Sequence, residues 1–502
     1  MGSATARLGR VALRFALAAT ALALTGCAAR YFQDAGPPPA QAPRFALEQW
    51  PHRSYWTGII FNGEKIGFSR TEIKPAAAPG EFELSSEAVI ALRFLGIEKS
   101  IRLRSHDRVA SDLTLRSFDY DYHIDGSDLR LTGRVEGAAL RVTIVAGGQP
   151  NEQSHALDEP LFPAAAIAFT PLHRGLAVGR ALDYLVYDGQ TQQLARVAQR
   201  VAAYQRSELF DGPAYRVETV MHGLTTTTWT RGDGLPLFEL GLGGVMISVL
   251  EGEAEAKRYL ASATLNKQDA LIDYSIARVT PPLERPREAR WMRLTLEAPG
   301  VGRAAPSGDG QDCRRADDIT ECEVGAPRPP SPASTLTPEM AERALGPTFT
   351  VQSNFPALRQ AAAEITQGSA DHVERARRIV AWMDRNVEKT AVDSFSALDV
   401  FERRKAECQG HAWLYAALAR AAGVPTRVVN GIAYSEDFKG FLFHSWNESW
   451  IDGRWLPVDA TFGQVGADAA RVRLVDGELM SDLLPLLEWV GRIRVRQVEI
   501  RH

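Results

Sequence analysis

Apolar and polar residues alternate in short runs over most of the first half of the chain, and turn-forming pairs separate the runs. The run Trp56–Phe61 is followed by Asn62–Gly63, a preferred two-residue hairpin loop, and then by Glu64–Phe68. Further turn signals lie at Asp125–Gly126, Glu136–Gly137, Gly147–Gly148, Asp211–Pro213, Gly232–Gly234 and Gly243–Gly244. This spacing predicts an antiparallel β meander over residues 54–276, either as one large curved sheet or as two smaller β units that meet near residues 160–171.

After residue 336 the apolar positions follow a helical period instead. Thr337 precedes Pro338, which is the pattern of an N-cap followed by proline at the first helical position. A stripe with the spacing i, i+3, i+4 and i+7 consists of Val373, Ala376, Ile379, Val380, Met383 and Val387. It predicts one long helix. Another helix is predicted to begin at Cys408 and to end at Gly423, with Pro425 just beyond as a stop signal.

The pairing of the last two predicted strands can be derived from the turn that joins them. Three strands follow the helices, over residues 426–432, 443–451 and 454–462. Asp452–Gly453 is a two-residue hairpin loop, and pairing outward from it places Trp446 opposite Asp459. His444 lies two residues from Trp446, so it faces the same side of the sheet and is a diagonal neighbour of Asp459. The C-terminal third is therefore predicted to be α+β, with an imidazole and a carboxylate on one face of its sheet; a slip of one residue would separate them.

The composition bounds the number of domains and excludes one class of partner. With 502 residues, the chain is long enough for roughly three domains. A stretch rich in Gly, Pro, Ser, Asp and Arg separates the two patterned regions. The predicted units are one or more antiparallel β domains over residues 51–299, a linker over residues 300–335 and an α+β domain over residues 336–502. A net charge of -4 with 24% charged residues shows no bias toward nucleic acid, so no nucleic-acid partner is expected.

The N-terminus has the features of an export signal. Basic residues lead into an apolar stretch over residues 15–24, which is too short to span a bilayer. It ends in Leu24–Cys27, which resembles the lipobox of bacterial lipoproteins. That resemblance implies a signal peptide over residues 1–27 and acylation of Cys27, for example with palmitate; an ordinary signal peptide or an uncleaved anchor is the alternative. The Pro-rich residues 28–50 would then be a tether, and the protein would face the periplasm from a bacterial membrane. The outer membrane is favoured because the residue after Cys27 is not acidic.

Export would place the remaining cysteines in an oxidising compartment. Cys313 and Cys322 lie nine positions apart in a stretch without apolar periodicity, which favours a local disulfide over two unpaired thiols. If that pair forms, Cys408 is the cysteine left over. An odd cysteine in an exported protein indicates a reactive thiol or an intermolecular partner.

Cys408, His444 and Asp459 together have the composition of a catalytic triad. The first turn of a helix favours a thiolate, and a nearby histidine favours it further. If the predicted helix packs its N-terminus against the His444 face of the sheet, then Cys408 is a nucleophile, His444 a base and Asp459 the group that orients the imidazole. Two other interpretations exist: Cys408 is part of the core, or it binds zinc together with His411, His444 and Asp459.

At these residues the sequence resembles the transglutaminase-like superfamily of papain-type cysteine enzymes. The matching blocks are ECQG at Glu407–Gly410, LARAAGVPTRV at Leu418–Val428, HSWNE at His444–Glu448 and WLPVDAT at Trp455–Thr461. They occur in family order and span about residues 340–470. The resemblance implies the family's catalytic roles for the cysteine, histidine and aspartate of these blocks. The upstream side chain that stabilises the oxyanion in several members cannot be placed, which leaves the backbone N–H of Cys408 as one candidate donor and the second donor open.

These observations predict a lipid-anchored periplasmic cysteine hydrolase, a protease or amidase, that acts on a peptide or protein amide through a Cys-His-Asp triad. Acyl transfer to an amine is the other outcome of the same chemistry, and hydrolysis is favoured over cross-linking. No cofactor and no metal are expected. The alternative from a different class is a catalytically inactive, lipid-anchored envelope scaffold whose β half binds a partner, because that half contains no cluster of catalytic residue types.

Overall fold

The computed structural model describes the chain from residue 31 onward. Besides residues 1–30, the positions outside the described residues are 62–63, 95–96, 147–148, 242–245, 258–275, 300, 302–304, 309, 326–334, 391, 479, 484, 487–488 and 490. The predicted signal peptide and Cys27 lie outside the described residues. Within the described part, no helix is both long and apolar enough to cross a membrane.

The N-terminal half forms one sheet, in which sixteen strands are found among the described residues. Its strands are β1 (Phe32–Asp34), β2 (Ser54–Phe61), β3 (Glu64–Pro75), β4 (Glu81–Phe94), β5 (Ile97–Ala110), β6 (Leu115–Ile124), β7 (Ser127–Glu136), β8 (Ala139–Ala146), β9 (Gln149–Ala156), β10 (Leu161–Pro163), β11 (Ala181–Asp188), β12 (Gln193–Ser207), β13 (Phe210–Met221), β14 (Leu224–Thr230), β15 (Pro236–Gly241) and β16 (Met246–Glu251). Two consecutive runs, β2–β9 and β10–β16, are joined where β16 pairs with β2. The alternative of two separate β units is therefore wrong.

The two runs share a core because the sheet curls back on itself. Buried residues of β3–β5 and of β11–β13 belong to one apolar cluster, which also contains Phe169 and Leu172 of helix α2 (Ala166–Arg174). Alternation explains the burial: along β7, every second residue from Ser127 to Leu131 is buried while those between them are exposed. The predicted first hairpin is confirmed, since Phe61 pairs with Glu64 across its loop.

A buried carboxyl group makes the stability of this sheet depend on pH. Asp107 on β5 is 0% exposed, and its Oδ1 atom accepts a 2.7 Å hydrogen bond from the Tyr120 hydroxyl. Its Oδ2 atom has no hydrogen-bond partner among the described residues. Burial raises the pKa of Asp107 to about 7, although the hydrogen bond from Tyr120 acts in the opposite sense. An unfolded aspartate ionises near pH 4, so between about pH 4 and pH 7 the folded state holds a proton that the unfolded state has lost.

We expect the free energy of unfolding to fall by about 2 kcal/mol between pH 5 and pH 8, because each unit of raised pKa corresponds to roughly 1.4 kcal/mol. Asp107→Asn, which is neutral at every pH and retains an acceptor for Tyr120, should remove this fall. Asp119→Asn, at a position on neighbouring β6, is the control and should keep the wild-type pH dependence. Chemical denaturation across this pH range measures both, and an unchanged pH dependence in Asp107→Asn would contradict the expectation.

The C-terminal part combines helices with a second sheet. Its helices are α5 (Pro338–Leu345), α6 (Pro356–Thr366), α7 (His372–Asn386), α8 (Ala397–Arg403) and α9 (Cys408–Ala421). Its sheet has the order β26-β25-β24-β23-β27 and consists of β23 (Thr426–Ser435), β24 (Gly440–Ile451), β25 (Arg454–Asp459), β26 (Gln464–Val465) and β27 (Arg471–Asp476), with β17 (Ile276–Arg278) also paired to β24. The predicted N-cap is confirmed, because the Thr337 hydroxyl accepts from the Met340 N–H. Helix α9 lies in the centre of this core, as eleven of its residues are buried.

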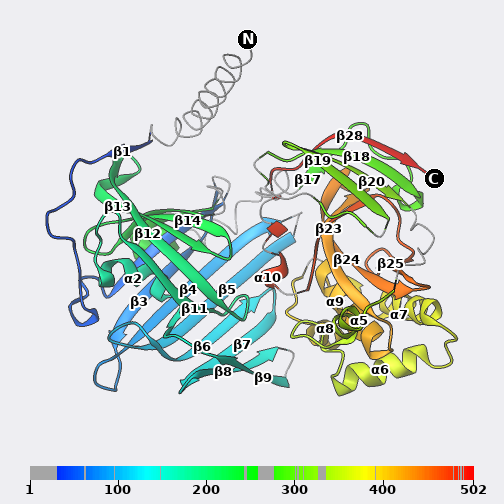
Figure 1. The fold of residues 1–502 in the computed structure, drawn as a ribbon, viewed down its shortest axis with the longest axis horizontal. Coiled ribbons are helices and arrows are strands. Elements are labelled where there is room, and N and C mark those ends of the chain that lie inside the picture. The colour runs from blue at the N-terminus through cyan, green and yellow to red at the C-terminus, as the bar shows by residue number, and fades with distance from the viewer. Residues whose placement is uncertain are drawn as a thin grey trace, which may run out of the picture.

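A small third sheet lies beside β23 and β24, and Figure 1 shows it above them. It consists of β18 (Trp291–Glu297), β19 (Gln311–Ala316), β20 (Ile319–Gly325) and the C-terminal β28 (Arg494–Arg501). The structure differs here from the sequence interpretation, because hairpin β19–β20 lies inside the stretch assigned to the linker. Charged residues on its exposed face conceal an alternating pattern in which Thr320, Cys322 and Val324 are buried. Cys313 and Cys322 form a disulfide between directly opposite positions of this hairpin.

Candidate active site

The β24–β25 hairpin has the register derived from its turn. Asn447 pairs with Val458, and the pairing continues to Ile451 and Arg454 next to the loop. The loop residues Asp452 and Gly453 have φ values of 52° and 74°, as a type I′ turn requires. Strand β25 ends at Asp459. In this register the Asp459 carboxylate lies on the same face of the sheet as the even-numbered residues of β24.

His444 and Asp459 are in direct contact at this point. The His444 Nε2 atom lies 2.8 Å from the Asp459 Oδ2 atom, and the two residues are 8% and 0% exposed. An ionised carboxylate can only accept hydrogen bonds, so the His444 Nε2 atom carries a proton and the Nδ1 atom is left as an acceptor. The imidazole is stacked on Phe462, with 4.7 Å between ring centroids, and the Phe462 N–H donates to Asp459 Oδ1 at 3.1 Å. The ring is therefore held in one orientation and one tautomer.

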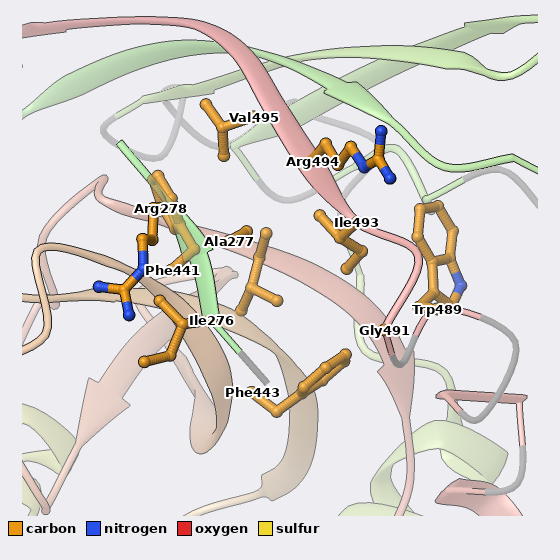
Figure 2. Close-up of a pocket in the computed structure, with 11 residues that line it drawn as sticks. Ile276, Ala277, Arg278, Phe441, Phe443, Trp489, Gly491, Ile493, Arg494 and Val495 are labelled. Atoms are coloured by element: carbon orange, nitrogen blue, oxygen red, sulfur yellow. The ribbon is translucent and has the colours of Figure 1, made fainter. Parts of the chain in front are cut away.

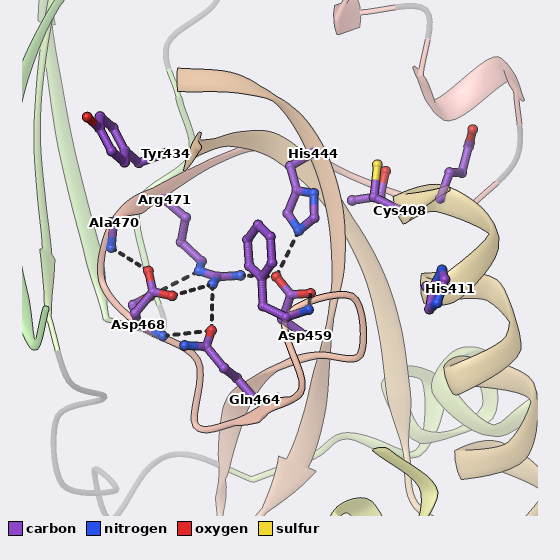
Figure 3. Close-up of polar contacts among 12 residues, drawn as sticks. Cys408, His411, Tyr434, His444, Asp459, Gln464, Asp468, Ala470 and Arg471 are labelled. Atoms are coloured by element: carbon purple, nitrogen blue, oxygen red, sulfur yellow. Dashed lines mark hydrogen bonds and ion pairs between the residues drawn. The ribbon is translucent and has the colours of Figure 1, made fainter. Parts of the chain in front are cut away.

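A buried arginine completes the surroundings of Asp459. Arg471 on β27 is 3% exposed, and its Nη1 atom lies 2.7 Å from Asp459 Oδ2. Its Nη2 atom lies 2.9 Å from Asp468 Oδ2 and donates to Gln464 Oε1 at 3.0 Å (Figure 3). Burial alone would raise the pKa of Asp459, but its interactions with His444 and Arg471 more than offset it and hold this pKa far below its usual range. Sequence reasoning missed Arg471; the only signal was a charged residue in an otherwise strand-like run.

Cys408 occupies the first position of α9, as predicted. The preceding residue Glu407 is the N-cap, and its carboxylate accepts from the N–H groups of Gln409 and Gly410 at 2.7 and 2.8 Å. The half-buried thiol donates to Glu407 Oε2 at 3.2 Å, and the backbone of Ser445, next to His444, also hydrogen-bonds to the sulfur. Figure 3 shows the His444 ring between Asp459 on one side and the Cys408 sulfur on the other. The three predicted site residues therefore converge.

The electrostatics of the thiol differ from the sequence expectation. Burial, followed by the charge and hydrogen bond of Glu407, raises the pKa of Cys408 well above its ordinary value, whereas the helix start was expected to lower it. Burial is the main reason, and the N-cap adds to it: the Glu407 carboxylate accepts from the N–H groups of Gln409 and Gly410 and places its own negative charge beside the sulfur. The resting site therefore contains a protonated thiol.

His411, the fourth member of the zinc alternative, faces away from this arrangement. Its Nδ1 atom donates to the backbone carbonyl of Glu407 at 2.9 Å, and its Nε2 atom is buried without a partner among the described residues. Burial lowers the pKa of His411. In the part of the chain that the structure describes, no group of three or more His, Cys, Asp or Glu side chains is placed to hold a metal ion.

A cavity of about 410 Å³ lies on the other side of β24 (Figure 2). It is lined by Ile276, Ala277, Arg278, Ile432, Phe441, Phe443, Trp489, Gly491, Ile493, Arg494 and Val495. Neighbouring residues of a strand point to opposite faces, so Phe443 lines this cavity while His444 faces Asp459. The cavity is separate from the Cys408 site.

Comparisons with known proteins identify this region. Residues 359–460 match the model of the transglutaminase-like superfamily. Over 119 residues the chain is 29% identical to the kyphoscoliosis peptidases of Mus musculus and of Homo sapiens. That match covers 21% of this chain and 18% of each peptidase, so the chain spans less than a fifth of these relatives. Among solved structures, a "putative cysteine protease from Cytophaga hutchinsonii" is 16% identical with a TM-score of 0.28, over 42% of this chain and 88% of that one. Residues 359–460, which contain Cys408, His444 and Asp459, are thus a domain of the transglutaminase-like superfamily.

Proposed function

We propose that the protein is a cysteine hydrolase, a protease or amidase, that cleaves an amide bond of a peptide or protein. Cys408 is the nucleophile, His444 the general base and acid, and Asp459 the residue that orients the imidazole. The observation that carries this proposal is the 2.8 Å contact between His444 Nε2 and Asp459 Oδ2, with the Cys408 thiol on the other side of the ring. Hydrolysis is favoured over transfer to an amine.

The reaction starts from a neutral thiol and a neutral imidazole. His444 Nδ1 takes the thiol proton as the sulfur attacks the amide carbonyl, and the backbone N–H of Cys408 is a candidate donor to the resulting oxyanion. The C–N bond then breaks, and His444 returns the proton to the leaving amine. Water, activated by the same imidazole, attacks the thioester. The C–S bond breaks, the acid is released, and His444 returns the proton to the Cys408 sulfur. Asp459 keeps its charge throughout, because Arg471 and His444 both stabilise the carboxylate.

We further propose that Cys27 carries lipid and that the protein works at the periplasmic face of a bacterial membrane, with the outer membrane favoured. The support is the sequence at Leu24–Cys27 behind an apolar stretch, together with the Pro-rich segment that follows it. A disulfide between Cys313 and Cys322 is consistent with an oxidising compartment.

The proposal predicts that Cys408→Ala removes the activity while leaving the fold intact, because the variant loses only the sulfur of a half-buried side chain. Wild type and Cys408→Ala are compared against envelope peptides and peptidoglycan fragments, and the loss in kcat/KM should be about a thousandfold or more. Mass spectrometry at short times should find an acyl group on Cys408 of the wild type. When an amine acceptor is added, hydrolysis gives the free acid as product, whereas transfer gives a new amide. Equal turnover by both proteins would overturn the role of Cys408 as nucleophile. No turnover of any amide by either protein would favour the inactive envelope scaffold instead.

A further inference from the structure

The turn between β6 and β7 reaches from the N-terminal sheet to the transglutaminase-like domain. Asp125 and Gly126 form this turn with φ values of 49° and 83°. Arg403, at the end of α8, donates from Nη2 to the Asp125 carbonyl at 3.1 Å. The same Nη2 atom lies 3.7 Å from the place that a Cβ on Gly126 would occupy, a van der Waals distance, so the guanidinium lies directly against the turn. The turn is therefore a docking point for α8.

Arg403 is also the centre of a polar cluster that joins the two domains. It forms an ion pair with Asp399 at 3.6 Å, and the two side chains are 18% and 10% exposed. Its Nη1 atom donates to the Asp393 carbonyl at 3.3 Å and to the hydroxyl of Ser127 on β7. The Ser127 Oγ atom lies 2.9 Å from both the Asp393 carbonyl and an Asp399 carboxylate oxygen. Its hydroxyl donates a hydrogen bond to one of these two oxygens. Such partly buried, charge-assisted hydrogen bonds are stronger than exposed ones.

The segment that contains Asp393 leads directly to the proposed nucleophile. The carbonyl of Val392 accepts from the N–H of Glu407 at 3.2 Å, immediately before Cys408. Ser394 lies against the first turn of α9, because its Oγ atom is 3.5 Å from the place of a Cβ on Gly410. A shift of residues 392–394 would therefore move Glu407, the residue that caps α9 and contacts the thiol.

Apolar packing supports the same junction. Phe349 and Phe395 of the C-terminal part pack against the buried cluster that is formed largely by β6, β7 and β8. Phe395 follows the segment directly, and its N–H donates to Asp399 Oδ2 at 3.2 Å. The segment is thus held from one side by the N-terminal sheet and from the other by Glu407.

We propose that the N-terminal sheet is a positioning element of the catalytic domain. Through Arg403, the turn Asp125–Ser127 holds residues 392–394 in the position that sets Glu407 and, with it, the Cys408 thiol. Arg403 and Ser127 are positioning residues, and neither is assigned a contact with substrate. The consequence for turnover rests on the proposed function, whereas the mechanical link to the thiol does not.

The test uses the full chain with Arg403→Met and the milder Ser127→Ala. Arg378→Met is the matched control. Like Arg403, Arg378 pairs with an acid four residues earlier, Glu374, and donates to a backbone carbonyl. Its contacts, however, lie on and next to α7, within one domain. Hydrogen exchange of residues 388–410 and the pH profile of iodoacetamide labelling at Cys408 are measured first, since neither needs a substrate. The kcat and KM values follow.

Both junction variants should exchange residues 388–410 faster, about tenfold in Arg403→Met, while α7 exchanges as in wild type, which excludes global unfolding. Labelling of Cys408 should shift to lower pH as the Glu407 carboxylate moves away, and kcat should fall about tenfold with KM within twofold. Arg378→Met should match wild type in every measurement. Unchanged exchange of residues 388–410, or unchanged labelling in the folded variants, would overturn the positioning role. A protein without amidase activity that still shows both changes would contradict only the proposed function.

Discussion

Replacement of His444 by alanine should lower kcat/KM for the amide substrate by about three orders of magnitude or more. The reason lies in the resting state of the thiol. Burial and the neighbouring Glu407 raise the pKa of Cys408, so few molecules carry a thiolate at neutral pH without a base to take the proton. In the proposed mechanism the His444 Nδ1 atom is that base, because Nε2 is engaged with Asp459. The variant should therefore depend on hydroxide, with a residual rate that rises up to the highest pH at which the protein stays folded.

Two further variants make this result interpretable. His444→Gln fills much of the same space between Trp446 and Phe462 but cannot act as a base, so it should be equally inactive if catalysis, rather than packing, is affected. His372→Ala, at the start of α7 and outside the site, should retain wild-type kinetics. Circular dichroism and thermal unfolding establish that the proteins compared are folded. A folded His444→Gln with kcat/KM within tenfold of wild type would exclude His444 as the base.

Replacement of Arg471 by methionine should reduce the free energy of unfolding by about 3 to 5 kcal/mol, as is typical when one partner of a buried ion pair is removed. The guanidinium contacts Asp459 and Asp468, whose side chains are both 0% exposed. Arg287 still pairs with Asp468 at 2.9 Å, but Asp459 loses its guanidinium partner and keeps the hydrogen bonds from His444 and the Phe462 N–H. Denaturant unfolding at pH 7 measures the loss. Arg293→Met removes an exposed ion pair with Glu323 and should unfold at nearly the same denaturant concentration as wild type.

The same variant has a signature in its pH dependence. The pKa of Asp459 lies below its unfolded value, so its contribution to stability is present above about pH 4 and is lost as the pH falls further. Without Arg471 that pKa should rise, and the loss of stability on acidification should become smaller. Arg471→Lys, which keeps the charge but not the planar fork, should lie between wild type and methionine. An Arg471→Met protein as stable as wild type at pH 7 would show that the arginine is not needed to compensate the two carboxylates.

The hairpin that presents His444 and Asp459 could be derived from the sequence because its information is local. A two-residue turn with positive φ at Asp452 and Gly453 determines the pairing of every residue that flanks it. The start of α9 and the apolar stripe of α7 are equally local, since caps and periodicity are encoded within a few residues.

The remaining features depend on residues far apart in the chain. Arg471 reaches Asp459 only because β27 pairs with β23 on the far side of the sheet, and Arg403 meets Asp125 across 278 positions. Neither contact has a periodic signature. Glu407 is adjacent to Cys408, yet it opposes the thiolate expected at the helix start, since a carboxylate at an N-cap stabilises the helix while it occupies the N–H groups that would stabilise a thiolate. The single large sheet likewise depends on the long-range pairing of β16 with β2.

The contact between the Cys408 thiol and the Glu407 carboxylate also bears on chemical durability. Peroxides and disulfides react with the thiolate and only slowly with the protonated thiol, so a cysteine held in its protonated form is protected from sulfenic acid and mixed disulfide formation. A strongly acidic thiol at the same position would be consumed by oxidants between encounters with substrate. In the proposed mechanism, the helix cap that makes Cys408 depend on His444 therefore also preserves it: the thiol reacts when a bound substrate and the imidazole act together and stays protonated for the rest of the time.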